Sequence, residues 1–192
     1  VKHLVDRHSI AVLSLAGPVH GLRKVEPGGR MAFFQEMMRP TFIDEMVSDW
    51  LVAVDRVLEE KKITIDSLGY FGLSMGTMFG VPLLASKLDF SASVIGLCGC
   101  SGAASMIRER LLKDAEKISH PTTFLMQLED ELFDRNGYLE LFDAIKSDNK
   151  KIHANPGLHP NVPKEEIDYS IEFLVNHLKS KAEFSAINPI AE

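Results

Sequence analysis

Cysteine is scarce in this sequence, with only Cys98 and Cys100 among 192 residues. One residue separates them, which is too close for an ordinary disulfide bridge. A structural zinc site usually needs a second pair of ligands, and the chain offers no second pair of cysteines. We interpret both as reduced, buried small residues, so a disulfide scaffold and a cysteine-based zinc site are excluded.

Long apolar runs and runs of one charge sign are also missing. No stretch approaches the roughly 18 uncharged residues that span a bilayer, and no basic segment followed by an apolar one opens the chain. The 21 basic and 27 acidic residues give a net charge of -6, and neither sign gathers in a run that could follow a phosphate backbone. We therefore expect no nucleic-acid partner, no membrane and a cytoplasmic location. The oligomeric state is not indicated.

Apolar residues make up 45% of the chain, which is enough for a core. Short apolar segments of strand length, bounded by glycine, proline or charge, recur along the sequence. They are Ile10–Leu15, Ser67–Leu73, Ala92–Leu97, Thr122–Leu128 and Lys150–Ala154. Longer amphipathic segments lie between them. This alternation predicts an α/β fold, with a mostly parallel sheet and helices on both faces.

Two amphipathic segments have clear helical spacing. The first contains Phe42, Met46, Trp50, Val54 and Leu58, and the second contains Ile167, Ile171, Leu174 and Leu178. The period is lost after Lys181, and no repeat or linker divides the chain. The sequence indicates one domain over residues 1–181, followed by a C-terminal tail over 182–192.

The segment "YFGLSMGTMFG", residues 70–80, joins a predicted strand to a predicted helix at Ser74. A sharp strand-to-helix turn holds its central residue in a strained backbone geometry and needs small residues two positions before and after it. Gly72 and Gly76 occupy those positions. The turn lifts the serine hydroxyl clear of the sheet, near the N-terminal end of the helix, where negative charge is favoured. Gly80 would let that helix lie close to a strand.

This G-x-S-x-G pattern, placed between a strand and a helix, resembles the α/β-hydrolase superfamily. The 56 positions from Ser74 to Asp130 leave no room for a large inserted lid. The chain is therefore similar to the small lidless serine esterases and to dienelactone hydrolases, which typically carry cysteine where this chain has Ser74. The resemblance implies a Ser-acid-His order, a small-molecule ester or thioester as substrate, and neither cofactor nor metal.

The segment "TTFLMQLEDELFDR" resembles the strand after which the superfamily places its acid, and Asp130 matches that position. Glu129, Glu131 and Asp134 compete on spacing alone. Some relatives place the acid after the preceding strand, but "GLCGCSGAAS" holds no carboxylate. For the base, "IHANPGLHPNVP" offers His153 within the last predicted strand and His159 in the loop behind it. The resemblance favours His159, because the base of the superfamily lies before the final helix.

The resemblance also implies two donors for an oxyanion. One is the backbone N–H of Met75, and the other comes from a loop behind an earlier strand. Because Ile10–Leu15 matches the fourth strand of the superfamily, the first strands are expected to be absent and the domain N-terminally incomplete. The third strand would then lie between Ile10–Leu15 and Ser67–Leu73, which should not pair with each other.

The leading hypothesis is a serine hydrolase in which Ser74 forms an acyl-enzyme, His159 transfers the proton and Asp130 orients the imidazole. An acyltransferase or a perhydrolase would use the same three residues with another acceptor. A non-catalytic protein of the same fold could instead bind an apolar ligand, although a pure binder has no need of all three side chains.

Overall fold

The computed structural model describes residues 2–187, and the chain divides into two compact units that meet at Thr64 and Ile65. The single domain over residues 1–181 that the sequence indicates stays a prediction. The last helix continues to Ile187, beyond the expected boundary at Lys181. Residues 188–192 of the predicted tail lie outside the described residues.

The first unit is helical. It contains α1 (Lys2–His8), the 3-10 turn η1 (Gly21–Arg23), α2 (Arg30–Met37) and α3 (Phe42–Lys61). Helix α3 buries one apolar face, formed by Phe42, Ile43, Met46 and Val54, as its helical spacing predicts. A cavity of about 220 Å³ opens in this unit beside Arg23 and Arg39, whose guanidinium groups are paired with Asp49 and with Glu36 and Glu45 respectively.

The strand predicted at Ile10–Leu15 is wrong. Residues 9–17 form neither helix nor strand, and the side chains of Val12 and Leu13 are each 38% exposed. Strand propensity expresses how well a side chain packs on a paired and half-buried sheet, so an apolar run with no neighbouring strand gains nothing from it. The expected gap between this segment and the strand at Ser67–Leu73 therefore has no counterpart in the described sheet.

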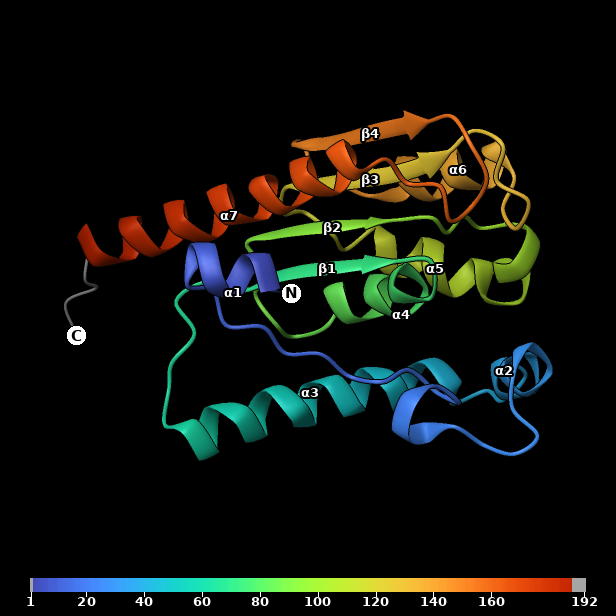
Figure 1. Cartoon of the computed structure of the whole chain (residues 1–192), viewed down its shortest axis with the longest axis horizontal. Helices are drawn as coiled ribbons and strands as arrows, with labels where there is room; N and C mark the ends of the chain where they lie inside the picture. The colour runs from blue at the N-terminus through green and yellow to red at the C-terminus, as the bar shows by residue number, and fades with distance from the viewer. Residues whose placement is uncertain (1, 188–192) are drawn as a thin grey trace. The chain divides into compact units, whose positions relative to one another are not determined.

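The second unit contains the sheet, and here the other four predicted strands are confirmed (Figure 1). They are β1 (Gly69–Leu73), β2 (Ala92–Gly96), β3 (Thr122–Gln127) and β4 (Lys150–Asn155). Their order in the sheet is β1-β2-β3-β4, and every pair is parallel. Strands β2 and β3 are buried along their whole length, which explains why neither alternates between apolar and polar residues in the manner of a strand with one solvent-exposed face.

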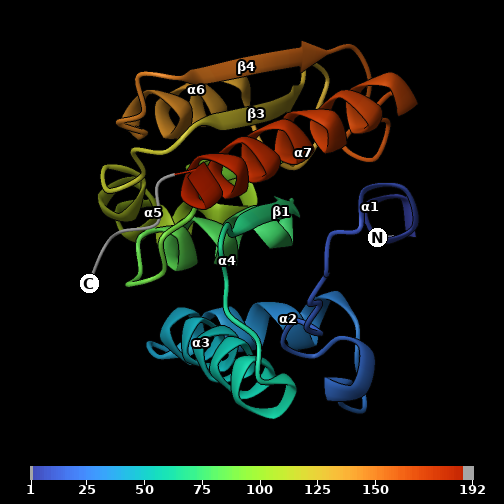
Figure 2. The same ribbon diagram turned by 90° about the vertical axis from the view of Figure 1, so that its left-hand side faces the viewer.

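Helices cover the sheet on both faces (Figures 1 and 2). The crossovers contain α4 (Met75–Leu84), then η2 (Gly102–Ile107) with α5 (Arg108–Ala115), then α6 (Arg135–Ala144). Because the strands follow in sequential order and such crossovers are right-handed, these helices gather on one face. Helix α7 (Lys164–Ile187) covers the other, where Leu174 packs into the cluster of Ala92, Val94 and Leu125.

A parallel sheet brings the carboxyl ends of all its strands to one edge. Ser74 follows β1, Asp130 lies in the loop after β3, and His159 lies in the loop after β4. The topology alone therefore places the three sequence-predicted residues at the same edge of the sheet.

Candidate active site

Ser74 occupies the turn between β1 and α4 with φ 56° and ψ -115°. This positive φ is uncommon for a residue with a side chain and must be held by its surroundings. The Ser74 N–H donates to the carbonyl oxygen of Gly96 over 2.9 Å, and its own carbonyl accepts from the N–H groups of Thr77 and Met78 at 2.9 and 3.0 Å. The strained residue is thus fixed to β2 on one side and to the first turn of α4 on the other.

Tyr70 and two glycines explain how α4 lies so close to β1. The Tyr70 hydroxyl donates to the carbonyl oxygen of Gly76 over 2.6 Å. A Cβ atom at Gly72 would lie 2.6 Å from the Tyr70 side chain, and one at Gly80 would lie 2.4 Å from it. At Gly76 the nearest such atom is 4.0 Å away. The expectation of a forced glycine is therefore met at Gly72 and Gly80, whereas Gly76 has room for a methyl group.

The three predicted side chains form a continuous chain of hydrogen bonds. His159 Nε2 lies 2.8 Å from Ser74 Oγ, and His159 Nδ1 lies 2.7 Å from Asp130 Oδ2. The side chain of Asp130 is fully buried, and the side chain of His159 is 14% exposed. A buried carboxylate on one ring nitrogen fixes the tautomer in which the other nitrogen can accept a proton. The imidazole is thus oriented to take a proton from the serine hydroxyl.

Asp130 is held by four donors. Its Oδ1 accepts from the backbone N–H groups of Leu132 at 2.8 Å and Phe133 at 3.1 Å, and its Oδ2 accepts from His159 and from the hydroxyl of Tyr138. Burial raises the pKa of the Asp130 carboxyl, but the hydrogen bonds outweigh it and leave the pKa below its ordinary value. The acid is therefore ionised at neutral pH.

The loop that carries His159 is tied to the sheet by Gln127, at the end of β3. Its buried amide donates to the carbonyl oxygens of Asn161 at 2.8 Å and Leu158 at 3.3 Å. The backbone N–H of His159 donates to Glu131 Oε2 over 2.9 Å. Gln127 is not among the residues predicted from the sequence, although a polar residue that follows the apolar residues Phe124, Leu125 and Met126 is a signal for such a role.

The competing residues are engaged elsewhere. Glu129 accepts from the Gly157 N–H, and Asp134 caps α6 by accepting from the Gly137 N–H at 2.8 Å. His153 Nδ1 lies 2.5 Å from Glu166 Oε1, between β4 and α7. None of these side chains takes part in the chain from Asp130 to Ser74 within residues 2–187.

Met75 is the first residue of α4. The N–H of the first residue of a helix has no partner inside the helix, so the Met75 N–H is available to an anion. The expected oxyanion donor therefore lies directly beside the serine, at the positive end of the α4 dipole.

Cys98 and Cys100 follow β2 and are both free and buried. Burial raises the pKa of the Cys100 thiol to about 12, and it raises that of Cys98 further. Both are unreactive thiols at neutral pH, as expected for small core residues.

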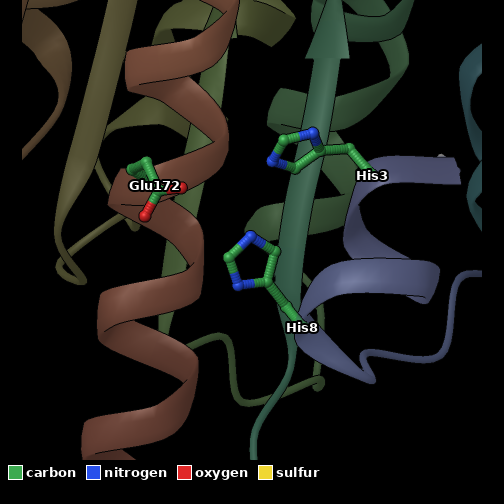
Figure 3. A group of neighbouring side chains, drawn as sticks. All are labelled: His3, His8 and Glu172. Atoms are coloured by element: carbon green, nitrogen blue, oxygen red, sulfur yellow. The ribbon is translucent and has the colours of Figure 1, made fainter.

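Figure 3 labels three side chains with metal-ligating atoms, which are His3 and His8 on α1 and Glu172 on α7. The two histidines belong to the first unit and Glu172 to the second. No other group of three such ligands occurs within the described part of the chain.

None of the described helices combines the length and the apolar content that crossing a bilayer requires.

Comparison with solved structures finds esterases and lipases. A cold-adapted esterase from an Arctic intertidal metagenomic library shares 31% identity and a TM-score of 0.65, over 73% of this chain and 65% of that one. A polyethylene glycol-bound complex of that esterase is 29% identical in sequence, with a TM-score of 0.67. The match covers 84% of this chain and 67% of that one. The monoacylglycerol lipase of Paleococcus ferrophilus shares 17% identity over 68% of this chain and 76% of its own, with a TM-score of 0.54, and this likeness concerns the fold alone.

No protein-family model and no curated protein matches the sequence. The chain spans about two thirds of the length of the esterase structures that it matches. It has an α/β fold with a parallel sheet, and its structural neighbours are esterases and lipases of the α/β-hydrolase fold.

Proposed function

We propose that this chain is a serine hydrolase that cleaves small carboxylic esters or thioesters through an acyl-enzyme. Ser74 Oγ attacks the acyl carbon while His159 Nε2 accepts the hydroxyl proton. The tetrahedral oxyanion is held by the Met75 N–H, and His159 returns the proton to the leaving group. Water then repeats the sequence, with His159 as base, and releases the acid and free Ser74.

The single observation that carries this proposal is the pair of distances around His159, 2.8 Å to Ser74 Oγ and 2.7 Å to Asp130 Oδ2. Nucleophile, base and orienting acid lie within hydrogen-bond reach in the correct order, and the acid is buried. A protein that only bound an apolar ligand would gain nothing from a buried carboxylate aimed through an imidazole at a strained serine. The likeness to esterases supports the same class of substrate.

The residues between Ser74 and Asp130 form α4, β2, η2, α5 and β3, and this segment contains no separate lid. This favours small, freely diffusing substrates, as in the lidless esterases and dienelactone hydrolases, over long-chain lipids. An acyltransferase or a perhydrolase would form the same acyl-enzyme as a hydrolase. The three activities differ only in the molecule that accepts the acyl group from Ser74.

The test is covalent labelling of the full chain with a fluorophosphonate probe, followed by peptide mapping, and hydrolysis of short p-nitrophenyl esters and of an acetyl thioester. We expect the probe to label Ser74. The Ser74→Ala variant should lose both the label and the ester turnover. Ser67→Ala is the matched control, because Ser67 lies before β1 and bonds Ser91 at the opposite edge of the sheet. Turnover in Ser74→Ala above a few per cent of the parent value would contradict the proposal.

The acceptor is tested by adding a primary alcohol or hydrogen peroxide at equal concentration to the ester assay. A hydrolase gives mainly the free acid in both cases. A dominant transfer ester or peracid would favour the acyltransferase or perhydrolase reading instead.

A further inference from the structure

We propose that Tyr138 is a positioning residue for the acid of the site, and that its hydroxyl holds Asp130 ionised and aligned toward His159. The proposal deepens the proposed function and rests on it for the catalytic part of its test. The observation behind it is that the Tyr138 hydroxyl donates to Asp130 Oδ2, the oxygen that also accepts from His159 Nδ1.

Tyr138 reaches Asp130 from α6, and its side chain is completely buried. The ring is fixed edge-on against Phe124 and Phe133, with centroid distances of 6.2 and 5.9 Å. Phe133 also contacts the His159 ring, with a centroid distance of 5.8 Å. One aromatic cluster thus holds both the hydroxyl donor and the imidazole against the same carboxylate.

The hydroxyl can act only as a donor to Asp130. Burial and the neighbouring carboxylate raise the pKa of Tyr138 far above its ordinary value, so the phenol keeps its proton at neutral pH. A carboxylate oxygen accepts more than one donor, so Tyr138 and His159 bind Oδ2 together. With Leu132 and Phe133 on Oδ1, the carboxylate cannot rotate without breaking a bond at each end.

The titratable groups that face Asp130 come from several elements. They are Tyr138 on α6, His159 in the loop after β4, Glu131 in its own loop and Cys98 after β2. Of these, Tyr138 is the only one whose side chain donates to Asp130 without being a partner of Ser74. Loss of its hydroxyl should therefore raise the pKa of Asp130 and loosen the imidazole, while substrate contacts stay the same.

The test is Tyr138→Phe, which keeps the packed ring and removes only the donor. Carbonyl-13C NMR of labelled aspartate, assigned with Asp130→Asn, should show the Asp130 titration midpoint moving to higher pH. In the ester assay kcat should fall about tenfold with KM nearly unchanged, as expected when one charge-assisted hydrogen bond is lost from the acid. Tyr169→Phe is the matched control, since Tyr169 lies on α7 with its ring against His153, and it should alter neither quantity.

A double variant guards against an unrelated packing effect. Tyr138→Phe added to Asp130→Asn should change turnover little beyond Asp130→Asn alone, because the donor no longer has its carboxylate. Full additivity would overturn the proposal, as would an unmoved midpoint, or a moved midpoint with unchanged kcat. These results are separate from failure of the proposed function, which would appear as turnover in Ser74→Ala above a few per cent of the parent value, while the Asp130 midpoint could still be measured.

Discussion

The hydroxyl oxygen of Thr77 lies 2.7 Å from the backbone nitrogen of Gly96, which donates to it. Thr77 is in the first turn of α4 and Gly96 ends β2, so a fully buried side chain bonds the helix that follows Ser74 to the neighbouring strand. Its own proton faces the carbonyl oxygens of Gly72 and Gly96, at 2.8 and 2.5 Å. The strained turn is therefore fixed from its interior side.

Thr77→Val keeps the shape of the side chain but leaves the buried N–H of Gly96 without its acceptor. We expect a loss of about 1–3 kcal/mol in the free energy of unfolding, and a lower kcat because the turn is less firmly held. Urea unfolding and the ester assay measure the two effects.

Thr123→Val is the control for this change. Thr123 is equally buried, and its hydroxyl has no hydrogen-bond partner among the described residues. Removing an unpaired buried hydroxyl should be neutral or stabilising. Equal destabilisation by both substitutions would show that the Thr77 bond contributes nothing specific.

Gly80→Ala should lower the free energy of unfolding, whereas Gly76→Ala should raise it. The new Cβ at Gly80 would lie 2.4 Å from the ring of Tyr70, which is tied to Gly76 by its hydroxyl and cannot easily give way. We expect Gly80→Ala to cost about 1–3 kcal/mol through overpacking. Gly76→Ala meets nothing closer than 4.0 Å and gains up to about 1 kcal/mol of helix propensity. The midpoints of urea unfolding measure both effects. A destabilised Gly76→Ala together with a neutral Gly80→Ala would contradict the close approach of α4 to the Tyr70 ring.

Asp130→Asn should fold and be slower by about 10⁴ in turnover, since an amide favours the wrong imidazole tautomer. Glu129→Gln and Asp134→Asn are the matched controls, because these carboxylates bond the N–H groups of Gly157 and Gly137 instead. Both controls should stay within a few-fold of the parent kcat. If either control loses activity and Asp130→Asn does not, the acid has been misassigned.

Local pattern was enough to predict four strands and the position of Ser74, because apolar runs, glycine spacing and the strand-to-helix junction are all contiguous in sequence. It failed at Ile10–Leu15, where a strand-like run pairs with none of the described strands and exposes the side chains of Val12 and Leu13. Propensity describes one segment, whereas pairing depends on a second one.

The residues that hold the site together were harder to find. Thr77 and Gln127 act on backbone groups brought near by the fold, 19 positions away for Gly96 and 34 for Asn161. Tyr138 looks like an ordinary core aromatic of α6, and only the packing of that helix on β3 turns its hydroxyl toward Asp130. Such roles arise from tertiary contact and have no local signature.

Acid should weaken the fold through Asp130. The folded-state pKa of this carboxyl is lower than its ordinary value of 3.8, so the unfolded chain binds its proton more readily. The stabilisation from Asp130 is therefore complete above about pH 4 and is lost as the pH falls through the lowered folded pKa.

Urea unfolding across this pH range should show a shallower acid-side decline of the free energy of unfolding in Asp130→Asn than in the parent protein. Tyr138→Phe should fall between the two, because it removes one of the donors that lower this pKa. Parallel acid-side curves for all three proteins would mean that Asp130 titrates alike in the folded and unfolded chains.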